Sequence, residues 1–164
     1  MGALIVRQKL TTDHWLWLEE NASIAGDKPV IVSLARLLSD REAFTDRSGE
    51  LGVVLQPDDD PLSLYGELNR LALIAVNFPV FTDGRGYSSA RLIRERLGWT
   101  GELRAIGDIQ RDQIPYLYRV GFDSFSLKAG QDPEQALSAF GDFSEAYQAS
   151  VAQPLPLFRR RRVA

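Results

Sequence analysis

The sequence lacks cysteine and contains a single histidine, His14. The absence of cysteine excludes disulfides, zinc–thiolate sites, iron–sulfur clusters and a cysteine nucleophile. One histidine excludes a multi-histidine metal centre, and any Ser-His-Asp triad would depend on that residue alone. We therefore predict no metal site, and the residues leave the identity of any cofactor unknown.

Long hydrophobic runs are absent as well. No apolar stretch reaches the roughly 20 residues that cross a bilayer. Residues 1–10 contain two cations, Arg7 and Lys9, but not the long apolar segment that a signal peptide needs. From these absences we expect a cytoplasmic protein that makes no use of a membrane.

Positive charge is scarce outside one cluster. The 164 residues include 19 Lys and Arg against 22 Asp and Glu, a net charge of −3. Four of the arginines are consecutive, at residues 159–162, so the remaining 15 cations face 22 acidic residues, a net charge of −7. Such a body repels phosphates, and we expect no nucleic-acid binding. The 45% hydrophobic content is that of one globular domain.

The sequence does contain an alternation of short apolar runs with amphipathic runs of helical length. Strands that alternate with helices predict right-handed βαβ units. The expected strands are residues 30–33, 51–55, 73–77, 103–107 and 124–127, and the expected helices are residues 34–45, 61–70, 87–97, 111–120 and 133–148. The predicted fold class is α/β, with about five βα units in a mostly parallel sheet, either open and doubly wound or a partial TIM-like barrel.

The two ends of the chain fall outside this alternation. Residues 3–6 and 14–18 are β-prone runs separated by a turn, which predicts an N-terminal β-hairpin or two short strands. After residue 148, prolines and arginines predict an extended or disordered tail. The expected organisation is a hairpin and connection in residues 1–28, an α/β domain in residues 29–148 and a flexible tail in residues 149–164.

Helix boundary signals support the alternation. Asp60 and Asp132 each precede a proline, which places an N-cap residue before a proline at the first helical position. Gly98 and Gly121 lie where two of the expected helices should end.

One loop after a predicted strand has an unusual composition, Asp83-Gly84-Arg85-Gly86-Tyr87. In parallel α/β folds, ligands bind beyond the carboxyl ends of the strands. The two glycines allow a ligand to approach closely, and the following helix start carries partial positive charge. Arg85 adds a forked cation and Tyr87 adds a hydroxyl group. Together these residues predict a loop that binds an oxyanion such as phosphate, sulfate or sulfite.

Two other interpretations of this loop remain open. In a purely structural one, Asp83 caps the helix, the glycines shape a turn, and Arg85 pairs with Asp83 or Asp108. In the other, Gly84 to Ser89 differs by one residue from the dinucleotide-binding fingerprint, and Asp108 lies near the spacing of a ribose-binding acid.

A second polar loop follows the next predicted strand and contains Asp108, Arg111 and Asp112. Asp108 and Asp112 are candidates for a general acid and base, or for groups that hold Arg85 and Arg111 in place. Lys128, after the fifth predicted strand, belongs to the same expected edge of the sheet. A solvated helix start, with Asp112 in its first turn, explains the same residues without chemistry.

Residues 71–79, 81–96, 101–108, 111–113 and 121–123 carry a family resemblance. They are similar to the signature of a bacterial domain-of-unknown-function family, number 934, and the resemblance extends from about residue 29 to residue 148. It implies a role in sulfite reduction, because members are described as oxidoreductases of that pathway and are commonly encoded beside the sulfite reductase hemoprotein. The resemblance brings no catalytic residues with it.

Two functional hypotheses follow. The first is an accessory or oxidoreductase protein of assimilatory sulfite reduction, with the sulfite reductase hemoprotein as partner and residues 154–164 as one contact. The alternative is a small enzyme that binds an anionic substrate or a nucleotide cofactor at Gly84-Arg85-Gly86. A homodimer through Trp15 or Trp17 is compatible with both hypotheses.

Overall fold

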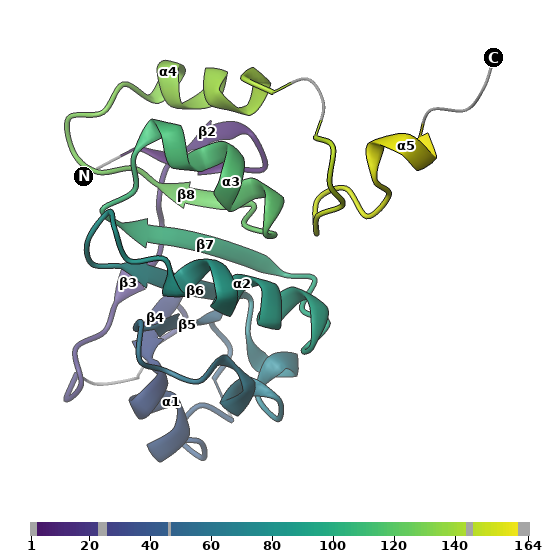
Figure 1. Ribbon diagram of the computed structural model, residues 1–164. Coiled ribbons are helices and arrows are strands. Elements are labelled where there is room, and N and C mark those ends of the chain that lie inside the picture. Colours follow the sequence, from purple (N-terminus) through teal and green to yellow (C-terminus); the bar gives the residue numbers. More distant parts are fainter. Residues whose placement is uncertain (1–2, 23–25, 46, 144–145, 161–164) are drawn as a thin grey trace.

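The computed structural model describes residues 3–22, 26–45, 47–143 and 146–160. Within these ranges the chain forms one sheet with helices packed on it, which confirms the predicted α/β class (Figure 1). The strands are β1 (Leu4–Val6), β2 (Lys9–Thr11), β3 (Leu16–Trp17), β4 (Val30–Ser33), β5 (Leu51–Leu55), β6 (Leu73–Phe78), β7 (Glu102–Gly107) and β8 (Ser124–Ser126).

The sheet has eight strands in the order β2-β1-β8-β7-β6-β5-β4-β3. Neighbouring strands from β3 to β8 are parallel, whereas β1 pairs antiparallel with both β2 and β8. The prediction of a mostly parallel sheet of five units is therefore corrected to a mixed sheet, curled into a half barrel. The sequence pattern missed this because the strands added at the two edges are only two or three residues long.

The N-terminal hairpin exists, but with a different second strand. β1 pairs with β2 so that Leu4 faces Thr11 and Val6 faces Lys9. Arg7 and Gln8 form the two-residue turn with positive φ angles of 48° and 62°, which suits the right-handed twist of a hairpin. The expected second strand, residues 14–18, is reduced to β3 and lies at the opposite edge of the sheet, parallel to β4.

The α-helices are α1 (Leu34–Ser39), α2 (Arg85–Glu95), α3 (Ile114–Arg119), α4 (Pro133–Ser138) and α5 (Leu157–Arg160). The described residues also form the 3-10 turns η1 (Pro61–Leu64), η2 (Leu68–Arg70), η3 (Arg111–Gln113) and η4 (Ala139–Gly141). The expected helix at residues 61–70 is thus two 3-10 turns, with Gly66, a poor helix former, between them. A short helix, α5, stands within the expected extended tail. None of the helices in the described ranges has the length and apolarity to cross a membrane.

Several boundary signals act as the sequence predicts. The Asp60 carboxylate accepts a hydrogen bond from the Leu62 amide, and the Asp132 carboxylate accepts from the amides of Glu134 and Gln135. Gly98 and Gly121 have positive φ angles of 67° and 112° where the preceding helices end.

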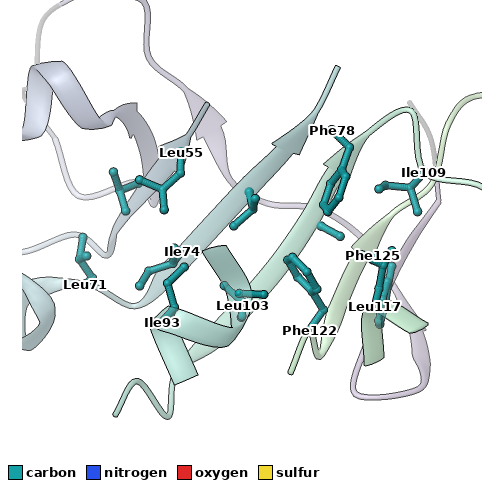
Figure 2. Close-up of a cluster of buried hydrophobic side chains, with 14 of the residues drawn as sticks. Leu55, Leu71, Ile74, Phe78, Ile93, Leu103, Ile109, Leu117, Phe122 and Phe125 are labelled. Carbon is teal, nitrogen blue, oxygen red and sulfur yellow. The ribbon is translucent and has the colours of Figure 1, made fainter. Parts of the chain in front are cut away.

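The main core lies between the helices and one face of the sheet. Successive residues of a strand point to opposite faces, so Ile74 and Phe78 face the helices whereas Leu73 and Ala75 face away. Figure 2 shows Ile74, Phe78 and strand neighbours packed against Ile93 of α2 and Leu117 of α3. The helices therefore cover one face, which leaves the carboxyl ends of the strands as an open edge.

Residues 12–15, here called the strap, join the two edges of the sheet from β2 to β3 (Figure 1). Seven strand spacings would separate these edges by roughly 34 Å in a flat sheet. The link from Thr11 to Leu16 spans at most about 18 Å. The sheet must therefore curl, and the strap crosses its inner face.

The strap fills the inner face with one apolar and one ionic contact. Trp15 is buried in a second core cluster with Ile31 and Leu73. Asp13 forms an ion pair with Arg104 of β7, whose side chain is only 1% exposed. Glu102 provides Arg104 with a second carboxylate at 2.7 Å.

Candidate functional site

Polar side chains gather at the carboxyl ends of the central strands. Asn77 of β6 donates a hydrogen bond from Nδ2 to the Gln56 Oε1 atom at 2.8 Å. Lys128, which follows β8, lies 2.9 Å from the Asp108 carboxylate, which follows β7. Several of the residues that the sequence analysis assigned to a ligand site lie at this edge of the sheet. Their contacts determine which side chains remain free to bind a ligand.

The Arg85 guanidinium, at the start of α2, is held by two carboxylates. Its Nε and Nη2 atoms donate to the Asp83 carboxylate at 3.0 and 2.7 Å, and its Nη1 atom donates to Asp58. These contacts raise the pKa of Arg85 and lower the pKa of Asp83. The Asp83 carboxylate also accepts from the Arg85 amide at 3.1 Å. The cation expected to hold an oxyanion is therefore already surrounded by negative charge, as the structural interpretation of the loop requires.

The two glycines of this loop differ in their surroundings. Gly86 is buried, and a Cβ atom there would overlap the Phe78 ring, with the ring's Cε1 atom 2.7 Å away. Gly84 has open space around the same position. The absence of a side chain at Gly86 thus serves the contact between α2 and β6, whereas Gly84 leaves the helix start open.

Asp108 and Lys128 form a pair at the same edge. The hydrogen bond from Lys128 lowers the pKa of the Asp108 carboxyl, against a smaller opposing effect of burial. The Asp108 amide donates to the Phe78 carbonyl at 2.7 Å, which fixes the residue beside the end of β6. Asp108 is therefore ionised at neutral pH, and its carboxylate accepts the hydrogen bond from Lys128.

Arg111 and Asp112 do not join this pair. The Arg111 guanidinium bonds instead to the Gln135 carbonyl, at 3.1 Å, and to the Asp142 carboxylate, at 2.8 Å. Asp112 is exposed in the first turn of η3. Among the described contacts none connects Asp108 with Asp112, and their assignment as general acid and base stays a prediction.

Tyr87 faces away from Arg85, toward α3. Its ring packs edge-on against Phe78 with centroids 5.6 Å apart, and burial raises the pKa of its hydroxyl. Tyr87 lines a cavity of about 470 Å³ between α2, α3 and residues 146–160, here called the arm. The cavity is lined by Tyr87, Arg91, Glu95, Tyr116, Arg119, Val120 and residues 148–151.

Sequence reasoning missed this cavity because the arm closes it. The amides of Val151 and Ala152 donate to the Arg119 carbonyl at 3.1 and 3.5 Å, which fastens the arm beside the C-terminal end of α3 (Figure 1). The mixture of polar and apolar residues after residue 146 could have indicated a packed segment, but it is equally typical of a disordered one.

Beside the cavity, large apolar side chains are exposed around α3 and the arm. We call Tyr116, Phe143 and Tyr147 the aromatic surface; their exposed fractions run from 52% to 70%. The Tyr116 and Phe143 ring centroids are 6.1 Å apart, and with Tyr147 they line a hollow of about 210 Å³. The sequence analysis named none of these three residues, because it placed the expected partner contact in residues 154–164.

The described residues contain no group of three or more His, Asp or Glu side chains placed to hold a metal ion. At the polar edge of the sheet, Arg85 and Lys128 are neutralised by neighbouring carboxylates. The cavity and the exposed aromatic side chains lie instead around α3 and the arm.

Residues 52–158 match the model of a family described as a bacterial protein of unknown function (DUF934). The match extends from β5 to the arm and covers more than half of the chain. A search among curated proteins finds no match.

Proposed function

Since the chain belongs to the DUF934 family, we propose that it is an accessory protein of assimilatory sulfite reduction that docks on the sulfite reductase hemoprotein. The pathway and the partner come from the sequence resemblance to this family. The observation that carries the docking role is the aromatic surface, whose Tyr147 side chain is 70% exposed.

Exposed aromatic side chains of this kind suit a protein interface. Tyrosine and phenylalanine bury a large area when a partner covers them, and tyrosine also offers a hydroxyl group. Large apolar patches on a protein surface commonly mark interaction sites. Tyr116, Phe143 and Tyr147 meet around one hollow, so a partner side chain has a place to insert.

Charge at the end of the arm favours an acidic partner surface. Arg159 and Arg160 lie on α5 beside Phe158, and the sequence continues with two further arginines. These cations stand on a body whose net charge is −7. Opposite charge on the partner would speed association and fix the orientation of the complex.

The accessory role is preferred to an autonomous oxidoreductase. The chain has no cysteine, and tyrosine and tryptophan alone do not store two electrons. Redox chemistry on this chain would require a bound cofactor.

The alternative, a small enzyme acting at Gly84-Arg85-Gly86, is the weaker proposal. Asp83 and Asp58 already neutralise Arg85, so an incoming anion would have to displace a carboxylate. Titration of the protein with sulfite, phosphate and nicotinamide dinucleotides in a calorimeter tests this alternative directly. Binding that Arg85→Gln abolishes would favour the enzyme.

The docking proposal is tested with the purified hemoprotein immobilised on a sensor. We expect the full-length protein to bind, and Tyr147→Ala to raise the dissociation constant about tenfold or more, because truncating an interface aromatic typically removes about 2 kcal/mol. Deletion of residues 154–164 should weaken binding in the same direction.

Tyr65→Ala is the matched control, because Tyr65 is 80% exposed but lies at the end of η1. Its affinity should equal that of the unmodified protein. The docking proposal fails if the unmodified protein does not bind the hemoprotein, or if Tyr147→Ala and Tyr65→Ala behave alike.

A further inference from the structure

The cavity beneath the arm has the size of a small-molecule site. Its volume of about 470 Å³ falls within the roughly 300–1,000 Å³ that such sites occupy. α2 forms one wall, α3 the second, and residues 148–151 of the arm the third. Three separate segments thus line one cavity. None of the residues of the aromatic surface belongs to α2.

The charge of the cavity wall is positive and rests on one residue. Arg91 and Glu95 neutralise each other, with the Arg91 Nε atom 2.9 Å from both carboxylate oxygens. Arg119 remains, and its buried Nε atom has no hydrogen-bond partner within the described residues. Since no carboxylate of the described residues pairs with the Arg119 guanidinium, its charge is left for a bound anion to compensate. On an acidic protein, this wall is suited to a negatively charged group.

Two aromatic rings stand near this cation. Tyr87 is partly buried against Phe78, which fixes its ring on the α2 wall. Tyr116 lies on the α3 wall, three residues before Arg119 and therefore about one helical turn away. The walls thus offer stacking surfaces for a planar ring as well as a partner for an anion.

We propose that this cavity binds a small anion that carries a planar ring, of the nucleoside monophosphate class, with its negative group at Arg119. Arginine is suited to the phosphate because its planar fork donates two parallel hydrogen bonds. The ring lies against Tyr87 and Tyr116, and residues 148–151 cover it. This site is separate from the Gly84-Arg85-Gly86 loop and does not depend on the docking role.

The test uses calorimetry on the full-length protein with three probes: adenosine monophosphate, adenosine and inorganic phosphate. We expect the monophosphate to bind at least tenfold more tightly than either fragment. Arg119→Gln should weaken monophosphate binding about tenfold or more and leave adenosine binding nearly unchanged.

Arg96→Gln is the matched control, since it removes the same charge from an exposed residue at the end of α2, outside the cavity lining. A second variant, Ala149→Trp, fills the cavity from an exposed position on the arm and should abolish binding with the fold intact by circular dichroism. The proposal is overturned if the unmodified protein binds no monophosphate, if Arg119→Gln equals Arg96→Gln, or if Ala149→Trp binds normally.

Discussion

Gly86 illustrates how a residue that looks functional in a sequence can be explained by packing. Two glycines around an arginine resemble a ligand-binding loop, yet the Phe78 ring occupies the space where a Gly86 side chain would stand. The ring belongs to β6 and comes eight residues earlier, so the sequence alone does not reveal this contact.

We predict that Gly86→Ala lowers the free energy of unfolding by about 1–3 kcal/mol, because the added methyl group must displace a buried aromatic ring. Gly84→Ala should change it by less than about 1 kcal/mol, since nothing lies within 4 Å of the new Cβ atom. Urea denaturation followed by tryptophan fluorescence measures both. Equal destabilisation by the two variants would contradict the packing explanation.

The pair of Asp108 and Lys128 gives a prediction about pH. Because the pKa of Asp108 is lowered in the folded protein, the pair stabilises the fold above the unfolded pKa, and this contribution is lost as the pH falls through the lowered value. We expect Lys128→Met to raise the pKa of Asp108 toward its ordinary value of 3.8.

A carboxyl carbon NMR titration of Asp108 measures this shift. Lys9→Met is the control, because Lys9 is exposed on β2 at an edge of the sheet. An Asp108 pKa that stays low in Lys128→Met would show that the backbone hydrogen bond from Phe81, and not the lysine, holds the carboxylate ionised.

Among the elements, the strap depends most on a single buried charge. Arg104 is 1% exposed and has carboxylates from Asp13 of the strap and Glu102 of its own strand. Removing Asp13 leaves the buried Arg104 cation with one carboxylate, that of Glu102, and a buried charge that loses a partner is costly.

We therefore predict that Asp13→Ala lowers the free energy of unfolding by about 3 kcal/mol. Hydrogen exchange should also speed up in β3, which the strap holds against β4. Glu20→Ala removes an exposed carboxylate a few residues later and should have little effect on either measurement. A loss no larger than that of Glu20→Ala would mean that the strap is held by Trp15 alone.

The sequence predicted the elements whose signals are local. Residues 30–33 and 51–55 form strands β4 and β5 with the expected bounds, because continuous apolar runs are typical of strands buried on both faces. Asp132 caps α4 as its position before a proline predicts. The prediction of a helix over residues 61–70 was wrong. Their apolar residues recur with helical spacing, but Gly66 and Asn69 disfavour a continuous helix, and the segment forms η1 and η2 instead.

Distant contacts account for what the sequence did not predict. Asp58 reaches Arg85 from 27 residues away, and that contact changes the chemistry expected at the glycine loop. The cavity requires Tyr87, Arg119 and Ser150 to meet, which no local spacing indicates. The oxyanion site and the acid–base pair therefore stay predictions, whereas the α/β class and the family are established.

At the scale of the whole molecule, the arm and the sheet differ in what holds them. Within the described residues, the buried apolar core extends from Leu4 to Ala139 and includes nothing from the arm. The arm is fastened to α3 by hydrogen bonds from the amides of Val151 and Ala152 to the Arg119 carbonyl, whereas the bond from the Leu157 amide to the Tyr147 carbonyl lies within the arm. Partners that compete for these few contacts can move the arm without disturbing the sheet.

The pairing of β1 with β8 also fixes the order in which the protein can be completed. During synthesis residues 4–6 leave the ribosome well before their antiparallel neighbour, residues 124–126. Until then Ile5, which is fully buried in the finished protein, has β2 beside it and an unfilled place on its other side. Contacts of such long sequence separation form late and slow the search for the native state. The nascent chain therefore carries an open edge on β1 until residues 124–126 have emerged to close it.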